Sequence, residues 1–105
     1  MEHAELTIEV TRKPTEAVVT ASCEIDGGTV HRLSEAVEGI LMDAPPRIVL
    51  DLDGVTFCDS QGLGTLVTLS QKARMMQSVL VITNVGKYLT RVLDVTGLRQ
   101  VLLIS

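Results

Sequence analysis

The sequence predicts a single α/β domain in which α-helices cover a mixed, mostly parallel β-sheet. Length is the first observation, since 105 residues are enough for one domain, residues 1–105, and too few for two. Composition is the second, since 46% of the residues are hydrophobic, enough to build a buried core. The third is that strand-like and helix-like stretches alternate over most of the chain. Such alternation is typical of parallel sheets with helical connections.

The chain begins with two predicted strands. Residues 6–10 alternate apolar and polar side chains, which is the pattern of a half-exposed strand, and residues 17–23 are small or β-branched. The polar turn between them contains Pro14, so the two strands are expected to form a hairpin. Residues 24–28 are then a predicted loop, because they combine charged residues with two glycines.

A helix and a third strand follow this loop. Thr29 is the predicted N-cap, and apolar residues recur at helical spacing over residues 30–41, before Pro45 and Pro46 prevent the helix from continuing. Residues 47–52 are nearly all apolar, as expected of a strand covered on both faces. The remaining predicted elements are a helix, a strand, a helix and a last strand, at residues 63–76, 78–83, 86–98 and 101–105. The predicted order is β-β-α-β-α-β-α-β.

Charge and composition argue against several classes of function. The formal net charge is −4, no basic stripe is present, and only Phe57 and Tyr88 are aromatic, which argues against nucleic-acid binding. No apolar run approaches the ~20 residues of a membrane helix, and the acidic N-terminus is unlike a signal peptide. Cys23 and Cys58 are too few for a disulfide framework and lack the spacing of metal ligands. We therefore expect reduced thiols, no metal site, no membrane contact and a cytoplasmic protein.

Residues 56–66 join the third strand to the next helix and combine polar side chains with glycines. An esterase serine needs a glycine two residues before it and a histidine later in the chain, but Cys58 occupies that position and no histidine follows Ser60. A dinucleotide-binding loop would need a third glycine where Val67 stands. We expect neither a catalytic triad nor a cofactor, so a small hydrolase or nucleotide-binding enzyme is the weakest functional hypothesis.

The aspartates near this loop allow a second interpretation. Asp53 and Asp59 are expected beyond the carboxyl end of the third strand, where open α/β sheets usually place their sites. A magnesium site or a phosphorylated aspartate, as in receiver domains, would use such acids. Receiver domains begin with alternating strands and helices, whereas this chain begins with two strands. Asp51 and Asp53 are therefore interpreted as an acid at the strand edge and an acid in a turn.

Ser60 itself has two interpretations, a helix cap and a regulatory switch. It is expected where the loop becomes a helix, and serine there commonly accepts a hydrogen bond from a first-turn N–H group. Gly62 and Gly64 each cost roughly 1 kcal/mol of helix stability relative to alanine, and they would remove side chains from around Ser60. A phosphate on Ser60 would lie at the positive helix end and add about −1.5 to −2 charge beside Asp59.

Three segments of the chain resemble one protein family. Residues 49–69 (VLDLDGVTFCDSQGLGTLVTL) resemble the signature of STAS domains, specifically of the bacterial anti-sigma factor antagonists. Residues 24–33 and 84–104 resemble the family's first loop and helix and its closing segment, in the family's order. The resemblance implies a single STAS domain over residues 1–105. Because the chain stops at Ser105, the family's C-terminal helix is expected to be missing or truncated.

The resemblance implies that the chain binds a partner and is not an enzyme. An unphosphorylated antagonist binds an anti-sigma factor that is also an ATP-dependent serine kinase, and this frees a sigma factor. The kinase phosphorylates the first serine of the motif, which matches Ser60, and the complex breaks. A PP2C-type phosphatase then restores the antagonist. The residues implied to contact the partner are Asp26, Asp59, Gln61, Gly62, Leu63 and Gly64.

Departures from the family pattern leave an alternative function open. Gln61 replaces the motif's second serine and is expected to alter kinase preference, and Cys23 replaces a loop glycine. The alternative is a constitutive STAS adaptor subunit of a larger assembly, such as a stressosome-like or lipid-transport complex. An adaptor of this kind would need no phosphorylation.

Overall fold

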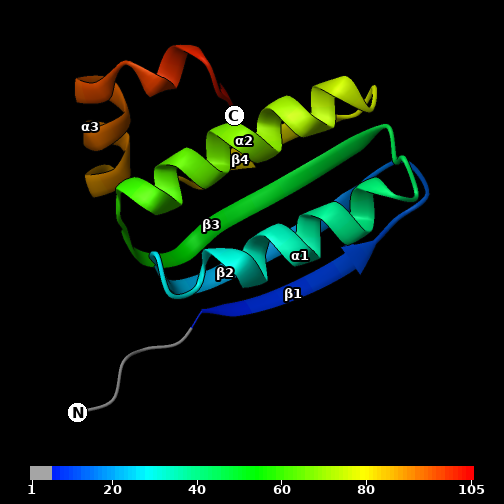
Figure 1. Cartoon of the computed structure of the whole chain (residues 1–105), viewed down its shortest axis with the longest axis horizontal. Helices are drawn as coiled ribbons and strands as arrows, with labels where there is room; N and C mark the ends of the chain where they lie inside the picture. Colours follow the sequence, from blue (N-terminus) through cyan, green and yellow to red (C-terminus); the bar gives the residue numbers. More distant parts are fainter. Residues whose placement is uncertain (1–5) are drawn as a thin grey trace.

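The described residues form one five-stranded sheet with helices packed on it. The structure is a computed structural model and describes residues 6–105, so the acidic N-terminal residues 1–5 lie outside the described part. Figure 1 shows the path of the chain. In chain order the elements are β1 (Thr7–Arg12), β2 (Ala17–Ile25), α1 (Val30–Leu41), β3 (Arg47–Cys58), α2 (Ser60–Met75), β4 (Val79–Thr83), α3 (Lys87–Thr96), the 3₁₀ helix η1 (Leu98–Gln100) and β5 (Leu103–Ile104).

The sheet is mixed and mostly parallel, as the sequence predicts. Its strand order is β1-β2-β3-β4-β5, so each strand pairs with its neighbours in the sequence. β1 and β2 form the predicted hairpin and are antiparallel, with Arg12 opposite Ala17. The other three pairs are parallel, because a helix carries the chain back across the sheet between β2 and β3, β3 and β4, and β4 and β5.

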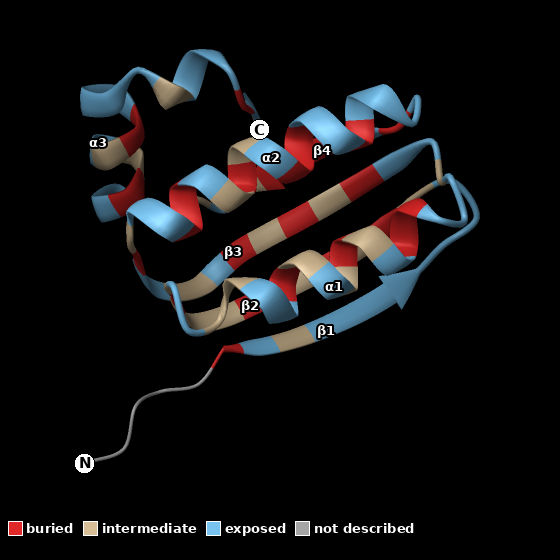
Figure 2. Ribbon diagram, in the orientation of Figure 1, coloured by how far each residue is buried: buried red, intermediate tan, exposed pale blue. Residues whose placement is uncertain are grey.

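The core lies between the sheet and the helices α1 and α2, which both cover one face (Figures 1 and 2). Alternate side chains of β2 and β3 are buried beneath these helices: Ala17, Val19, Ala21, Ile48, Leu50 and Leu52. The expectation that residues 47–52 are covered on both faces is wrong, because Val49 and Asp51 are only half-buried. The strand therefore buries every second side chain, as in a sheet with one covered face.

β3 is twice as long as predicted, and its extension positions the site. The strand runs from Arg47 to Cys58, so Asp53 lies within it and not beyond its end as the sequence suggested. The second half pairs with the end of β2, where Ile25 lies opposite Cys58 and two register shifts interrupt the ladder. Gly54 permits this pairing, because a Cβ atom there would lie 2.4 Å from the Ser22 Oγ atom. The ends of β2 and β3 are thereby held together.

The C-terminal part follows the predicted order with a shorter last strand. Gly97 ends α3 in the left-handed conformation, with φ of 77°, as expected of a C-terminal glycine. β5 covers only two residues, Leu103 and Ile104, because η1 and a turn occupy the residues before it. Among residues 6–105, no helix is both long enough and apolar enough to cross a membrane.

Candidate functional site

Asp59 caps α2 and holds a neighbouring loop at the same time. Its Oδ1 atom accepts a hydrogen bond from the Gly62 N–H at 2.8 Å, which is the bond of a helix N-cap. Its Oδ2 atom accepts a hydrogen bond from the Gly27 N–H at 3.1 Å, in the loop between β2 and α1. The Asp59 backbone N–H also donates to the Ile25 carbonyl at 3.1 Å. Asp59 therefore links the start of α2 to the loop that precedes α1.

Ser60 is not the cap, so the cap interpretation of this residue is wrong. It is the first residue of α2, and the Asp59 carboxylate already accepts the first-turn N–H that a serine cap would bind. The Ser60 side chain is exposed, and within residues 6–105 its hydroxyl forms no hydrogen bond. The hydroxyl is therefore free to react with a group supplied by another molecule.

The two glycines of the motif have different structural roles. Gly62 is buried, and a Cβ atom there would lie 2.7 Å from the Cys58 Sγ atom and 2.9 Å from the Ile25 carbonyl oxygen. The expectation that Gly62 clears space around Ser60 is therefore wrong, because this glycine lets α2 pack closely on β2 and β3. Gly64 is exposed, and a Cβ atom there would meet nothing within 4 Å.

Two other residues named from the motif differ in exposure, since Gln61 lies at the surface and Leu63 is buried. The Gln61 side chain is exposed and lies over the β2–α1 loop, because a Cβ atom on Gly27 would be 2.7 Å from the Gln61 Oε1 atom. Leu63 is 7% exposed and belongs to the hydrophobic core. Ser60, Gln61 and Gly64 thus form the accessible part of the motif, while Leu63 acts through packing.

Asp26 and Thr29 shape the loop that Asp59 holds. The Asp26 Oδ1 atom accepts the Gly28 N–H at 2.9 Å, and the Asp26 carbonyl accepts N–H groups of Thr29 and Val30 at 3.0 and 2.9 Å. Thr29 occupies the predicted N-cap position of α1, but its side chain makes no capping bond. Its hydroxyl instead accepts the Asp26 N–H and donates to the Glu24 carbonyl. The loop is therefore ordered by its own side chains.

Cys58 lies directly beneath the motif and is chemically inert there. It is 3% exposed, and burial, with a smaller contribution from the negative charge of Asp59, raises the pKa of its thiol to about 12. The thiol is therefore protonated at neutral pH and is a poor nucleophile. Cys23 is half-buried and also free. Within residues 6–105, no cluster of three potential metal ligands occurs.

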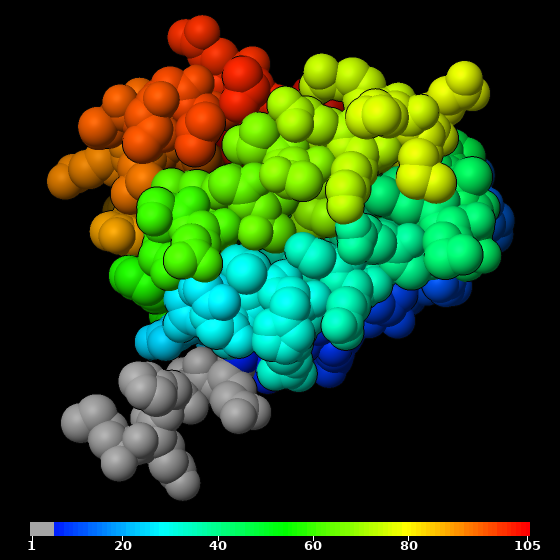
Figure 3. Space-filling view, in the orientation of Figure 1, coloured from blue at the N-terminus to red at the C-terminus, as the bar shows by residue number. Residues whose placement is uncertain are grey.

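Two exposed aromatic residues adjoin this site, and the motifs of the sequence did not indicate either of them. Phe57 is 40% exposed and Tyr88 is 58% exposed, and both line one small cavity together with Cys58 and Gly86. Figure 3 shows the start of α2 at the surface between the start of α1 and the segment of α3. The only sign of these two residues in the sequence was that aromatic residues are rare in it. Their position near each other depends on the fold.

The fold and this junction place the chain in a known class. The chain belongs to the STAS domain family, whose sequence pattern matches residues 7–105, so the resemblance noted from the motifs is confirmed. The anti-sigma-B factor antagonist of Listeria monocytogenes is 30% identical over 98 residues, which cover 92% of this chain and 86% of that protein. The anti-sigma-B factor antagonist of Staphylococcus aureus is 29% identical over 97 residues, with 92% and 90% covered.

A solved structure agrees with these relatives. The crystal structure of an anti-sigma factor antagonist from Mycobacterium paratuberculosis matches this chain with a TM-score of 0.86 and 28% sequence identity. The match covers 98% of this chain and 89% of that protein. The similarity therefore extends through the whole domain, including the β3–α2 junction.

Proposed function

We propose that this protein is an anti-sigma factor antagonist that is switched by phosphorylation of Ser60. When Ser60 is unphosphorylated, the protein binds an anti-sigma factor that is also an ATP-dependent serine kinase, and a sigma factor is released. Phosphorylation of Ser60 ends the binding, and a PP2C-type phosphatase reverses the change. The observation that carries the proposal is the free, exposed Ser60 hydroxyl at the start of α2 in a chain similar to named antagonists.

The start of α2 accommodates a phosphate without a change of fold. Residues 60 and 61 are at the first turn, where N–H groups have no acceptor one turn earlier in the helix, and the helix dipole there favours negative charge. The site is also held rigidly, because Asp59 bonds to both Gly27 and Gly62. The effect of a phosphate is therefore expected at the surface and not in the core.

A phosphate at this position changes the surface that a partner meets. It adds about −1.5 to −2 charge next to the Asp59 carboxylate and near Asp26. Like charges brought together across an interface, or groups that no longer fit, cost several kcal/mol, and each ~1.4 kcal/mol is tenfold in affinity. The partner-binding residues of the proposal are Asp26, Asp59, Gln61 and Gly64, with Gly62 and Leu63 setting the position of α2.

The role of Ser60 as a substrate is tested by direct phosphorylation. Each ATP-binding anti-sigma factor kinase of the source organism is purified and incubated with this protein and Mg-ATP, and the modified residue is mapped by mass spectrometry. We expect one kinase to phosphorylate Ser60, and the Ser60→Ala variant to remain unmodified. Thr68→Ala is the matched control, because Thr68 is also an exposed hydroxyl residue on α2 and should leave phosphorylation unchanged.

Two outcomes would contradict the proposal. If the kinase phosphorylates another residue while Ser60 stays unmodified, Ser60 is not the residue that switches binding. Stable binding to a scaffold or transporter protein, with no kinase acting on the chain, would favour a constitutive adaptor subunit in its place. In both cases the exposed serine would need a different explanation.

A further inference from the structure

The outward face of α3 carries side chains that the core does not use. Tyr88, Arg91 and Val95 are spaced three and four residues apart, so they share one side of the helix, and all three are exposed. Val95 is 81% exposed, although it is fully aliphatic. Leu89 and Leu93 bury the opposite side of the same helix. The exposed side therefore combines an aromatic, a cationic and an aliphatic side chain.

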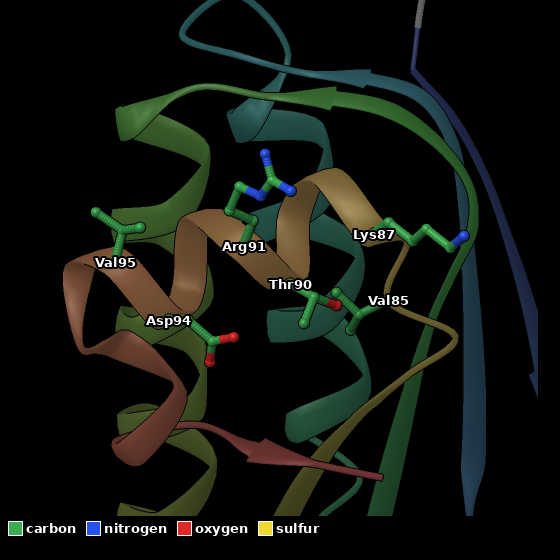
Figure 4. A pocket seen from close by; sticks show the side chains of 6 residues that line it. All are labelled: Val85, Lys87, Thr90, Arg91, Asp94 and Val95. Atoms are coloured by element: carbon green, nitrogen blue, oxygen red, sulfur yellow. The ribbon is translucent and has the colours of Figure 1, made fainter.

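Two basic residues of this helix have no ion-pair partner within the described residues. Lys87 and Arg91 form no ion pair within residues 6–105. They line a cavity of about 410 Å³ whose one acidic side chain is Asp94. The Asp94 carboxylate pairs with Arg99 at 3.1 Å, and Figure 4 shows the Arg91 side chain directed away from it. Two cations on this side of α3 therefore remain available to an external anion.

This face is continuous with the surface around Ser60. Phe57 and Tyr88 line the same small cavity as Cys58, which immediately precedes Asp59. These are the chain's two aromatic residues, and both stand exposed beside the junction and outside the hydrophobic core. Figure 3 shows the segment of α3 at the surface next to the start of α2, so a protein that reaches Ser60 also meets this side of the molecule.

The composition of this face is that of a protein interface. Aromatic residues and arginine are enriched in the centres of protein interfaces, where they supply most of the binding energy. The charge of the combined surface also changes along its length, from the acidic Asp26 and Asp59 beside Ser60 to the basic Lys87 and Arg91 on α3. A partner that covers both parts needs an acidic and apolar segment opposite α3.

We propose that Phe57 and the outward face of α3 form a second contact surface for the same anti-sigma factor kinase that meets Ser60. We name this the α3 surface, and it consists of Phe57, Lys87, Tyr88, Arg91 and Val95. Phe57 and Tyr88 are its apolar anchors, and Lys87 and Arg91 bind an acidic segment of the kinase. This inference rests on the proposed function, because it assumes the same partner.

The α3 surface is tested by measuring affinity for the kinase that phosphorylates Ser60, by calorimetry at two salt concentrations. We expect Tyr88→Ala to weaken binding about tenfold or more, as for an interface anchor. We expect the double variant Lys87→Glu/Arg91→Glu to weaken binding by a similar factor and to reduce its dependence on salt. Lys87 is the first residue of α3, where an acidic residue favours the helix, so this variant should remain folded.

Matched controls are available at the opposite end of the molecule and on the β1–β2 turn. Met42→Ala removes another exposed apolar side chain, which is 82% exposed at the end of α1, and should leave affinity unchanged. Lys13→Glu introduces half of the charge change of the double variant, at an exposed residue of the β1–β2 turn. It should have little effect on affinity for the kinase. Thermal unfolding of every variant checks that the fold is retained.

The outcomes separate this inference from the proposed function. If the wild-type protein binds and is phosphorylated on Ser60, but Tyr88→Ala and the double variant bind within about twofold of it, the α3 surface is overturned and the switch stands. If the wild-type protein binds no anti-sigma factor kinase, both proposals are overturned. Weaker binding by all variants, controls included, would also overturn the α3 surface, because the effect would not depend on position.

Discussion

The Asp59 carboxylate accepts a hydrogen bond from the Gly27 N–H at 3.1 Å, although the two residues are 32 positions apart in the chain. Its other oxygen caps α2 through the Gly62 N–H. One side chain therefore sets the position of the helix that presents Ser60 and the position of the loop that contains Asp26.

Replacing Asp59 with alanine should lower the free energy of unfolding by roughly 1–2 kcal/mol, because it removes a helix cap and leaves the Gly27 N–H without its acceptor. Urea denaturation followed by circular dichroism measures the change. Asp59→Asn should lower the free energy of unfolding by less, since the asparagine amide oxygen replaces one of the two carboxylate oxygens that accept hydrogen bonds. Asp53→Ala is the control, because the exposed Asp53 side chain forms no hydrogen bond with residues 6–105. Equal losses in Asp59→Ala and Asp53→Ala would contradict this account.

Alanine at the two motif glycines should have opposite effects on stability. Gly62→Ala should destabilise the protein by about 1–3 kcal/mol, because the new methyl group overlaps the Cys58 Sγ atom and the Ile25 carbonyl. Gly64→Ala should stabilise it by up to ~1 kcal/mol, because the position is open and alanine favours a helix. Urea denaturation of both variants provides the comparison. If Gly62→Ala is as stable as Gly64→Ala, the close packing at Gly62 is not what requires a glycine.

The raised pKa of Cys58 predicts a loss of stability in alkaline solution. The folded thiol titrates at about 12 against an ordinary value of 9.0, so above pH 9 the unfolded chain loses this proton while the folded chain keeps it. The unfolded state then binds fewer protons, and the free energy of unfolding falls with rising pH by up to about 1.4 kcal/mol per pH unit between pH 9 and 12. The contribution is fully present below pH 9.

This pH dependence is measured by urea denaturation between pH 8 and about pH 10.5, in wild-type protein and in Cys58→Ala. The variant lacks the buried thiol, so its stability should fall less steeply over the same range, although its stability at neutral pH is lower. Cys23→Ala is the control for the removal of the other free cysteine. Parallel curves for wild type and Cys58→Ala would show that the Cys58 thiol does not cause the loss.

The proposed switch predicts different effects for two Ser60 variants. Ser60→Ala should bind the anti-sigma factor kinase within about twofold of wild type, because the Ser60 hydroxyl supports no bond within residues 6–105. Ser60→Asp should bind at least about tenfold more weakly, because it places a second carboxylate beside Asp59. Calorimetric titration measures both, with Thr68→Asp as the control for an added charge elsewhere on α2. Equal binding by Ser60→Ala and Ser60→Asp would mean that charge at this position does not control the complex.

The sequence predicted the order of the strands and helices correctly, because each segment has a clear apolar period or a clear turn. The predicted length of β3 was too short, because its second half, residues 53–58, has no regular alternation of buried and exposed side chains. That half is a strand because β2 pairs with it across two register shifts. The sequence left the cap interpretation of Ser60 open for a related reason, since Asp59 and Ser60 are both capable of capping and only the helix boundary distinguishes them.

By itself, the sequence determined the class of fold, the family and the position of Ser60 at the start of a helix, because these depend on local patterns and on a contiguous motif. Tertiary structure alone decided that Asp59 holds Gly27, that Gly62 is required by the atoms beneath it, and that Phe57 lies beside Tyr88. Each of these relationships joins residues from different elements. Their distances are set by strand pairing and helix packing, which no single stretch of the chain encodes.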